Sequence, residues 1–166
     1  MKKILTVFSF LLIQIGVCNA QVANEKEDAF VKAFFEVLKK GDKKLLVEKF
    51  LLKESDLEVY NQSRAAVGSK VVLTKDEFAK LVEDRNSKIT RGFEELRTSA
   101  AKAKVTFENT EFKSYKKFED ASAEVPAGYY KMMFILHEQY VFKVQFEASP
   151  LGDDFKLYNI MNTVSM

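Results

Sequence analysis

The segment YYKMMFIL, residues 129–136, is apolar on both of its alternating faces except at Lys131. We expect it to form a β-strand in which both rows of side chains need cover, because an antiparallel sheet ordinarily shows water one of its faces. One row should pack on a long helix. For the other row the sequence leaves three covers open: the first helix, a second subunit in a homodimer, or a ligand in a cavity.

One row of this strand is the candidate face for a ligand or a partner. Methionine side chains adapt to irregular surfaces, which favours a ligand or a second subunit as the cover. Complete burial inside the core is the alternative, and the pattern does not separate these outcomes. The candidate face consists of Tyr129, Lys131, Met133 and Ile135.

Three further segments predict the other strands. Residues 105–108 alternate between apolar and polar side chains, and residues 140–148 do so over a longer run. The stretch SPLGD, residues 149–153, has the composition of a turn, and residues 155–161 follow as the last strand. Together these segments predict an antiparallel sheet whose last three strands form a meander.

Helices precede the strands. Apolar residues recur every three or four positions over residues 24–40 and again after Thr74, and shorter helices are expected after Asp42 and over residues 56–66. Thr74 and Glu77 form a capping box at the start of an amphipathic helix of roughly 25 residues, in which Gly92 predicts a kink. The predicted fold class is α+β, with N-terminal helices, including one long amphipathic helix, packed on a C-terminal four-stranded antiparallel sheet.

The first twenty residues predict a secretory signal peptide. A short basic start precedes an apolar run over residues 4–17, and the small residues of the triplet Cys18-Asn19-Ala20 follow. The run has 14 residues, fewer than the roughly 18 needed to cross a bilayer as a helix, and no later segment predicts a membrane span. Cleavage after Ala20 would leave a single α+β domain at residues 21–166, in the periplasm or outside the cell. Attachment of a lipid to Cys18 is the less favoured alternative, because the branched Val17 precedes it.

Composition excludes several classes of function. The chain has 26 Lys and Arg and 24 Asp and Glu, so removal of Lys2 and Lys3 with the signal leaves 26 − 2 = 24 basic residues and no net charge. A neutral domain argues against a nucleic-acid partner. Cys18 is the only cysteine, so the mature domain would have no disulfide and no thiolate metal site.

No sequence motif predicts catalytic residues, a metal or a cofactor. His137 is the only histidine and is expected in a hairpin turn, without an orienting partner. Asp153 and Asp154, with Glu147, could touch a hard cation, but the alternating oxygen ligands of a calcium loop are missing. A polar turn is therefore the favoured interpretation.

A second candidate surface lies in FKSYKKFED, residues 112–120, where cationic and aromatic side chains alternate. Such a mixture can stack bases or hold an anionic surface. The favoured alternative is that the lysines prevent the edge of the sheet from pairing with other chains. The candidate patch consists of Lys113, Tyr115, Lys116 and Lys117.

The order of elements resembles that of small exported bacterial proteins with nuclear-transport-factor-2-like or cystatin-like folds. The segments that carry this resemblance are TKDEFAKLVEDRNSKITRGFEEL, AKVTFENTEF, YYKMMFIL, YVFKVQFEA and DFKLYNIM. The resemblance implies a cone-shaped pocket between helix and sheet. Some members of the superfamily, such as ketosteroid isomerase-like proteins, set an aspartate base against tyrosine or acid donors, and others bind ligands or dimerise. No residue of this chain matches the catalytic set, so none is assigned a role.

The sequence therefore predicts an exported, non-catalytic domain. It would bind a small apolar ligand or a protein partner through its sheet face or a helix–sheet pocket. One alternative is a small-molecule enzyme that uses Tyr and Asp or Glu chemistry in such a pocket. Another is a structural or envelope-stress factor that acts by self-assembly.

Overall fold

The computed structural model describes residues 25–119, 129–138 and 140–165. The predicted signal peptide, Cys18 and the start of the first helix at residue 24 lie outside the described residues. Within them, no helix is both long and apolar enough to cross a membrane.

The first helix occupies residues 25–40 and buries one face completely. Val31, Phe34 and Leu38 are each 0% exposed, as their helical spacing requires. The helix ends at Gly41, whose φ of +66° places it in the left-handed region that favours glycine. Asp42 then caps the next turn, since its carboxylate accepts a hydrogen bond from the Leu45 amide at 2.9 Å.

Short elements link this helix to the long one. They are α2 (Lys43–Leu45), the π-helical turn η1 (Leu46–Phe50), the 3-10 turn η2 (Glu54–Asp56) and α3 (Leu57–Ala66). The predicted helix over residues 56–66 is therefore present as α3, whereas the segment after Asp42 divides into two short turns. These elements are too short to bury a continuous helical face.

The long helix, α4, spans Lys75–Lys102. The predicted capping box is confirmed: the Thr74 hydroxyl accepts from the Glu77 amide, and the Glu77 carboxylate accepts from the Thr74 amide at 2.8 Å. The helix runs without interruption through Gly92. A Cβ at Gly92 would lie 2.9 Å from the carbonyl oxygen of Ile160, so glycine permits the close approach of α4 to the last strand.

The strands are β1 (Thr110–Glu119), β2 (Tyr129–His137), β3 (Tyr140–Leu151) and β4 (Asp154–Ser165), hydrogen-bonded in that order and all antiparallel. The expected strand at residues 105–108 is wrong, because residues Phe107–Asn109 form a 3-10 turn, η3. Val105 and Phe107 are both buried, which explains the alternating pattern without a strand.

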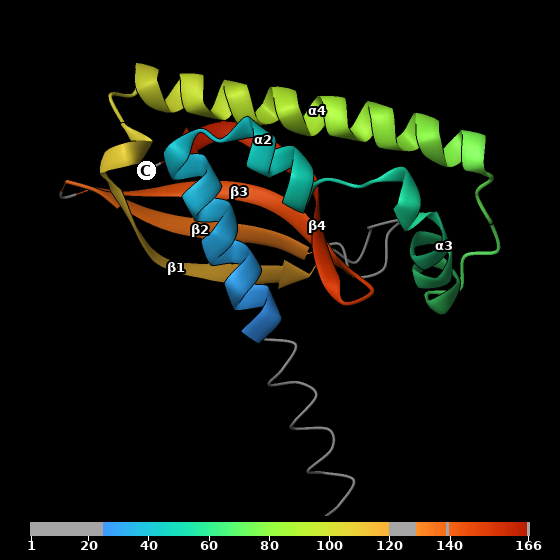
Figure 1. Ribbon diagram of the computed structural model, residues 1–166. Coiled ribbons are helices and arrows are strands. Elements are labelled where there is room, and N and C mark those ends of the chain that lie inside the picture. The colour runs from blue at the N-terminus through green and yellow to red at the C-terminus, as the bar shows by residue number, and fades with distance from the viewer. Residues whose placement is uncertain (1–24, 120–128, 139, 166) are drawn as a thin grey trace, which may run out of the picture.

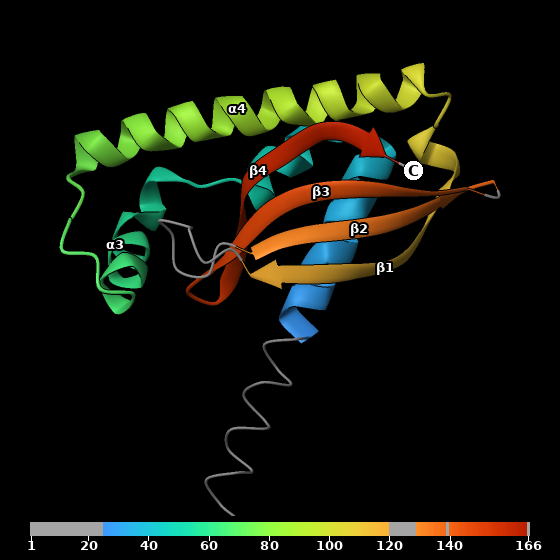
Figure 2. The same cartoon turned by 180° about the vertical axis from the view of Figure 1, so that it is seen from behind.

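The fold class predicted from the sequence is wrong in how the sheet and the helices assemble. Among the strands, α4 packs on β4, and it runs along that edge of the sheet, while the helix at residues 25–40 crosses one face (Figures 1 and 2). β4 does not continue the sheet regularly, since its register with β3 shifts between Val144 and Phe146 and again between Glu147 and Ala148. It curves toward α4 (Figure 2). The long helix therefore packs on one irregular edge strand and does not rest on a uniform four-stranded platform.

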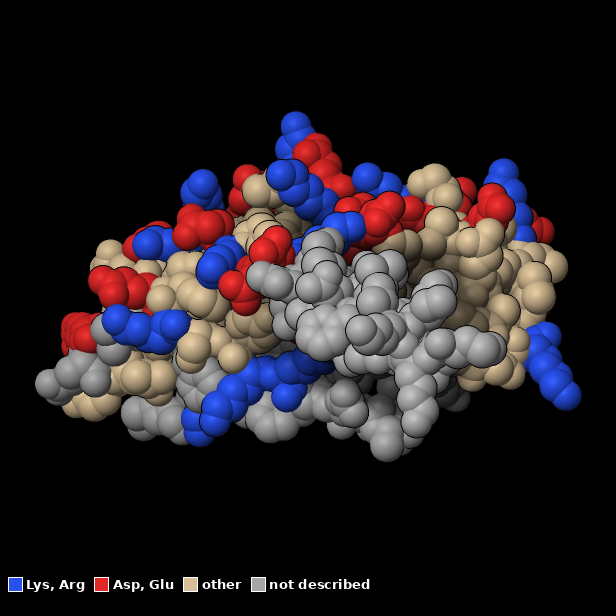
Figure 3. Space-filling model, turned by 90° about the horizontal axis from the view of Figure 1, so that it is seen from below, with Lys and Arg blue, Asp and Glu red and all other residues tan. Residues whose placement is uncertain are grey.

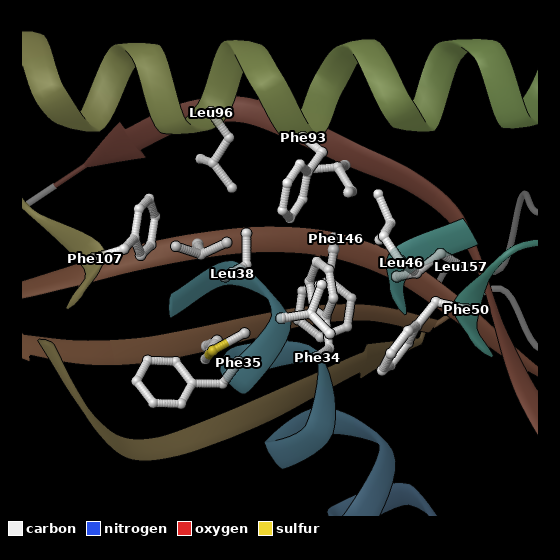
Figure 4. Close-up of a cluster of buried hydrophobic side chains, with 14 of the residues drawn as sticks. Phe34, Phe35, Leu38, Leu46, Phe50, Phe93, Leu96, Phe107, Phe146 and Leu157 are labelled. Atoms are coloured by element: carbon white, nitrogen blue, oxygen red, sulfur yellow. The ribbon is translucent and has the colours of Figure 1, made fainter. Parts of the chain in front are cut away.

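The main core lies between the helix at residues 25–40, α4 and the sheet (Figure 4). Phe34 is at its centre, with its ring centroid 4.9 Å from that of Phe146 on β3 and 5.8 Å from that of Phe50. A smaller second core lies beneath α3 and the start of α4. It contains the buried residues Leu52, Tyr60, Phe78, Val82 and Leu151.

Candidate binding groove

A surface groove of about 540 Å³ lies where the helix at residues 25–40 meets η1 and the start of β4. Ligand sites of small molecules commonly enclose roughly 300–1,000 Å³, so the groove is large enough for one. Three separate segments line it. The lining residues are Lys26, Ala29, Phe30, Ala33, Glu48, Lys49, Phe50, Lys53, Asp153, Asp154, Phe155 and Lys156.

The floor of the groove is aromatic. The ring centroid of Phe30 lies 5.2 Å from that of Phe50 and 5.5 Å from that of Phe155. Phe50 is only 3% exposed, whereas Phe30 and Phe155 are half-buried and present part of their rings to the groove. Two half-buried aromatic rings thus line the groove and form an apolar surface.

Local structure explains how these rings meet. Lys26, Phe30 and Ala33 lie on one side of their helix because side chains four and seven positions apart share a face. Gly152, with a φ of +61°, forms the tight turn that reverses the chain from β3 into β4 and brings Phe155 beside Phe30.

Charged side chains surround this floor. The Lys26 ammonium donates a hydrogen bond to Asp153 Oδ1 at 2.9 Å. This hydrogen bond, and then the positive charge of Lys26, lower the pKa of Asp153 below its ordinary value of 3.8. Glu48 lies 3.8 Å from the ammonium of Lys44, which does not line the groove. Two of the three carboxylates in the lining are therefore already paired.

A second groove, of about 510 Å³, flanks the other side of the same helix. It is lined by two aromatic side chains, Phe35 and Phe112, whose ring centroids lie 5.8 Å apart. Its lysines are already engaged, because Lys32 pairs with Asp28 at 3.2 Å and Lys39 donates to the Thr110 carbonyl at 3.1 Å. The charged groups that line the first groove are less completely paired than these lysines, so the first groove is the better candidate.

The candidate face predicted on β2 is part of the core where it is described. Met133 and Ile135 are both 0% exposed and belong to the main core with the helix at residues 25–40. Of the covers left open by the sequence, the first helix is the one found over these two residues. Tyr129 and Lys131 lie on the same strand, but their side chains are outside the described residues.

The register of β1 and β2 brings the two predicted surfaces together. Tyr115 lies opposite Met133, and Lys117 lies opposite Lys131. The register shifts between Phe112 and Ser114, which leaves Lys113 as the extra residue of a β-bulge. Tyr115 of the predicted patch therefore lies on the same, core-facing side of the sheet as Met133 of the predicted ligand face.

The predicted patch is not a uniform cationic surface. Lys113 pairs with Glu111 at 3.2 Å, and Lys117 pairs with Glu27 at 3.5 Å. Lys116 is exposed, whereas Tyr115 is half-buried. Seen from below, basic and acidic side chains are interspersed along the upper part of the view, whereas a short run of basic side chains lies by itself along the lower part (Figure 3).

Glu27 is a buried carboxylate that the sequence interpretation did not single out as a site residue. It is 4% exposed and lies beside Tyr115 and Lys117 at the start of the first helix. Burial, then the charge of Glu27 and a hydrogen bond with Asp28, raise the pKa of Tyr115. Its spacing in the sequence could have indicated this burial, because Glu27 stands four residues before the buried Val31 on the same helical face.

The remaining chemical candidates do not converge on one site in the described part of the chain. His137 is half-buried, and its ring lies edge-on to Phe142 at 6.3 Å. Asp153 and Asp154 are exposed at the β3–β4 turn. In the described part of the chain, no three His, Cys, Asp or Glu side chains are grouped so that they could hold a metal ion.

No protein-family model, curated protein or solved structure matches this chain. Any functional conclusion therefore rests on the geometry and chemistry of the groove.

Proposed function

We propose that this chain is an exported, non-catalytic binding protein that holds a small apolar ligand in its helix–sheet groove. The observation that carries the proposal is the pair of half-buried rings, Phe30 and Phe155, at 5.5 Å in a groove of about 540 Å³. Apolar pockets with a few polar groups around them are the usual form of a small-molecule site. The proposal of export rests on the signal-like sequence of residues 1–20.

A protein partner at the candidate face on β2 is a weaker form of the same proposal. Met133 and Ile135 are covered by the chain's own first helix, so a partner would have to displace that helix to contact them. The groove requires no such rearrangement. A small ligand is therefore the occupant that we favour.

The test uses N-phenyl-1-naphthylamine, a neutral apolar probe whose fluorescence rises on leaving water. Phe155→Ala should abolish most of the fluorescence increase because it removes one ring from the floor. Phe112→Ala is the matched control, since Phe112 is also half-buried against the first helix but lines the second groove. Probe binding that is absent in the unmodified protein, or equally weakened by both substitutions, would contradict the proposal.

A second candidate function is a small-molecule enzyme with Tyr and carboxylate chemistry. The observation in its favour is the meeting of Tyr115, Asp28 and Glu27 at the start of the first helix. Neither Tyr115 nor Glu27 lines either of the two grooves described above. Soaking experiments in which a substrate-like molecule bound against Tyr115 would favour this alternative, and binding at Phe155 alone would count against it.

A further inference from the structure

The groove has more unpaired positive than negative charge around its aromatic floor. Its lining contains Lys26, Lys49, Lys53 and Lys156 against Glu48, Asp153 and Asp154. Lys26 and Asp153 neutralise each other at 2.9 Å, and Glu48 lies 3.8 Å from Lys44 outside the groove. In the described part of the chain, three lysines then remain without a hydrogen bond or ion pair through their ammonium groups, against one carboxylate, that of Asp154.

Lys156 is the least ordinary of these lysines. It is 5% exposed, whereas Lys49 and Lys53 are exposed. The aliphatic stem of Lys156 is buried, but its ammonium is not among the buried side-chain nitrogens without a partner in the described residues, so the charge stays accessible at the groove. Among the described residues, the structure shows no carboxylate paired with Lys156.

We infer that the ligand of this groove is an apolar carboxylate: a molecule with one apolar body and one anionic head. This inference rests on the proposed function and adds the chemical class of the ligand. The apolar body would lie on Phe30 and Phe155, and the carboxylate would accept hydrogen bonds from the unpaired lysines. Charge-assisted hydrogen bonds of this kind are stronger than neutral ones, and they select the charge of the ligand.

The charge pattern also separates this groove from its neighbour. In the second groove, Lys32 and Lys39 already have partners within the chain. An anion would have to displace those contacts to bind there, whereas at Lys49 and Lys53 it would displace only water. The chemistry therefore favours one groove for an anionic ligand.

The test compares three molecules with the same apolar tail: octanoate, octanol and octylammonium. Their affinities for the full mature chain are measured by competition with N-phenyl-1-naphthylamine at low ionic strength. Octanoate should bind roughly tenfold more tightly than octanol, and octylammonium more weakly than either. High salt should reduce the advantage of octanoate because the lysines at the rim are solvent-exposed.

Substitution of the lysines identifies the groove as the source of this preference. The variant Lys49→Met with Lys53→Met should lose most of the advantage of octanoate over octanol and keep the affinity for octanol. The control, Lys40→Met with Lys70→Met, removes the same charge from exposed lysines outside the groove and should retain the preference. A separate Lys156→Met variant should also lose most of the advantage of octanoate over octanol. If Lys156→Met does not fold, the double variant of the exposed Lys49 and Lys53 still tests the inference.

The outcomes distinguish the two proposals. Equal affinity for octanoate and octanol would overturn the inference about the carboxylate and leave the proposed apolar groove intact. A preference for octanoate that neither lysine variant reduces would overturn the inference as well. If the probe binds and Phe155→Ala abolishes that binding, but none of the three molecules displaces the probe, the inference is overturned. If the probe itself does not bind, the proposed function is overturned.

Discussion

Substitution of Gly92 by alanine tests how closely α4 approaches the last strand. An added Cβ would lie 2.9 Å from the carbonyl oxygen of Ile160, and carbon and carbonyl oxygen ordinarily meet at roughly 3.3–3.6 Å. The helix or the strand would therefore have to move by about 0.4–0.7 Å, because both atoms belong to or are fixed by the backbone. Overpacking of this kind costs about 1–3 kcal/mol, and the higher helix propensity of alanine offsets about 1 kcal/mol. We expect a net loss of up to about 2 kcal/mol in the free energy of unfolding.

Urea denaturation followed by circular dichroism measures this loss. Ser87→Ala is the control, since Ser87 is exposed on the same helix and the substitution changes propensity without a clash. It should leave the stability unchanged or slightly raised. The reasoning is refuted if Gly92→Ala stabilises the protein by about 1 kcal/mol, the value that helix propensity alone would give.

Three further predictions concern the cap, the groove rim and the core. Thr74→Ala should lower the free energy of unfolding by about 1 kcal/mol in thermal melts, because it removes the acceptor for the Glu77 amide; an unchanged melting temperature would contradict this role. Asp153→Asn should lower the free energy of unfolding at neutral pH, because it removes the ionised carboxylate that pairs with Lys26. This loss of stability should disappear as the pH falls below 3.8 and through the lower pKa of Asp153 in the folded state, where the carboxylate of the unmodified protein becomes protonated. A difference that persists at acid pH would rule out the ion pair as its source. Phe34→Ala should cost about 3–5 kcal/mol in urea denaturation, because the side chain is fully buried at the centre of the main core; a loss below about 1 kcal/mol would mean that the core repacks around the cavity.

Local signals predicted the helices well. Thr74 and Glu77 specify the start of α4, and Gly41 specifies the end of the first helix, because capping depends on residues within one turn. The predicted kink at Gly92 is wrong, because α4 continues as one helix through this residue. Only the position of Ile160, far along the chain, shows why glycine is needed there.

Interactions between distant segments were not predictable from the pattern. The β-bulge at Lys113 changes which side chains of β1 share a face, so a simple alternation rule fails beyond it. The shifts in register between β3 and β4 have the same effect on the sheet, and they explain why the expected platform for α4 is absent. Both features depend on pairing with another strand and leave no mark in local composition.

The candidate groove could not be predicted from the sequence either. Its floor combines Phe30, Phe50 and Phe155, which belong to a helix, a π-helical turn and a strand. Each phenylalanine alone fits an ordinary core position. The predicted ligand or partner face lies on β2, but Met133 and Ile135 of this strand belong to the core, because the first helix covers them.

The most direct test of the central claim is a titration of the isotopically labelled protein with octanoate, followed by amide chemical shifts. The proposed groove predicts that the largest changes fall in residues 26–33, 48–53 and 153–156, the three segments that line it. Changes confined to other segments, or no changes at concentrations that displace the fluorescent probe, would contradict the assignment of this groove as the binding site.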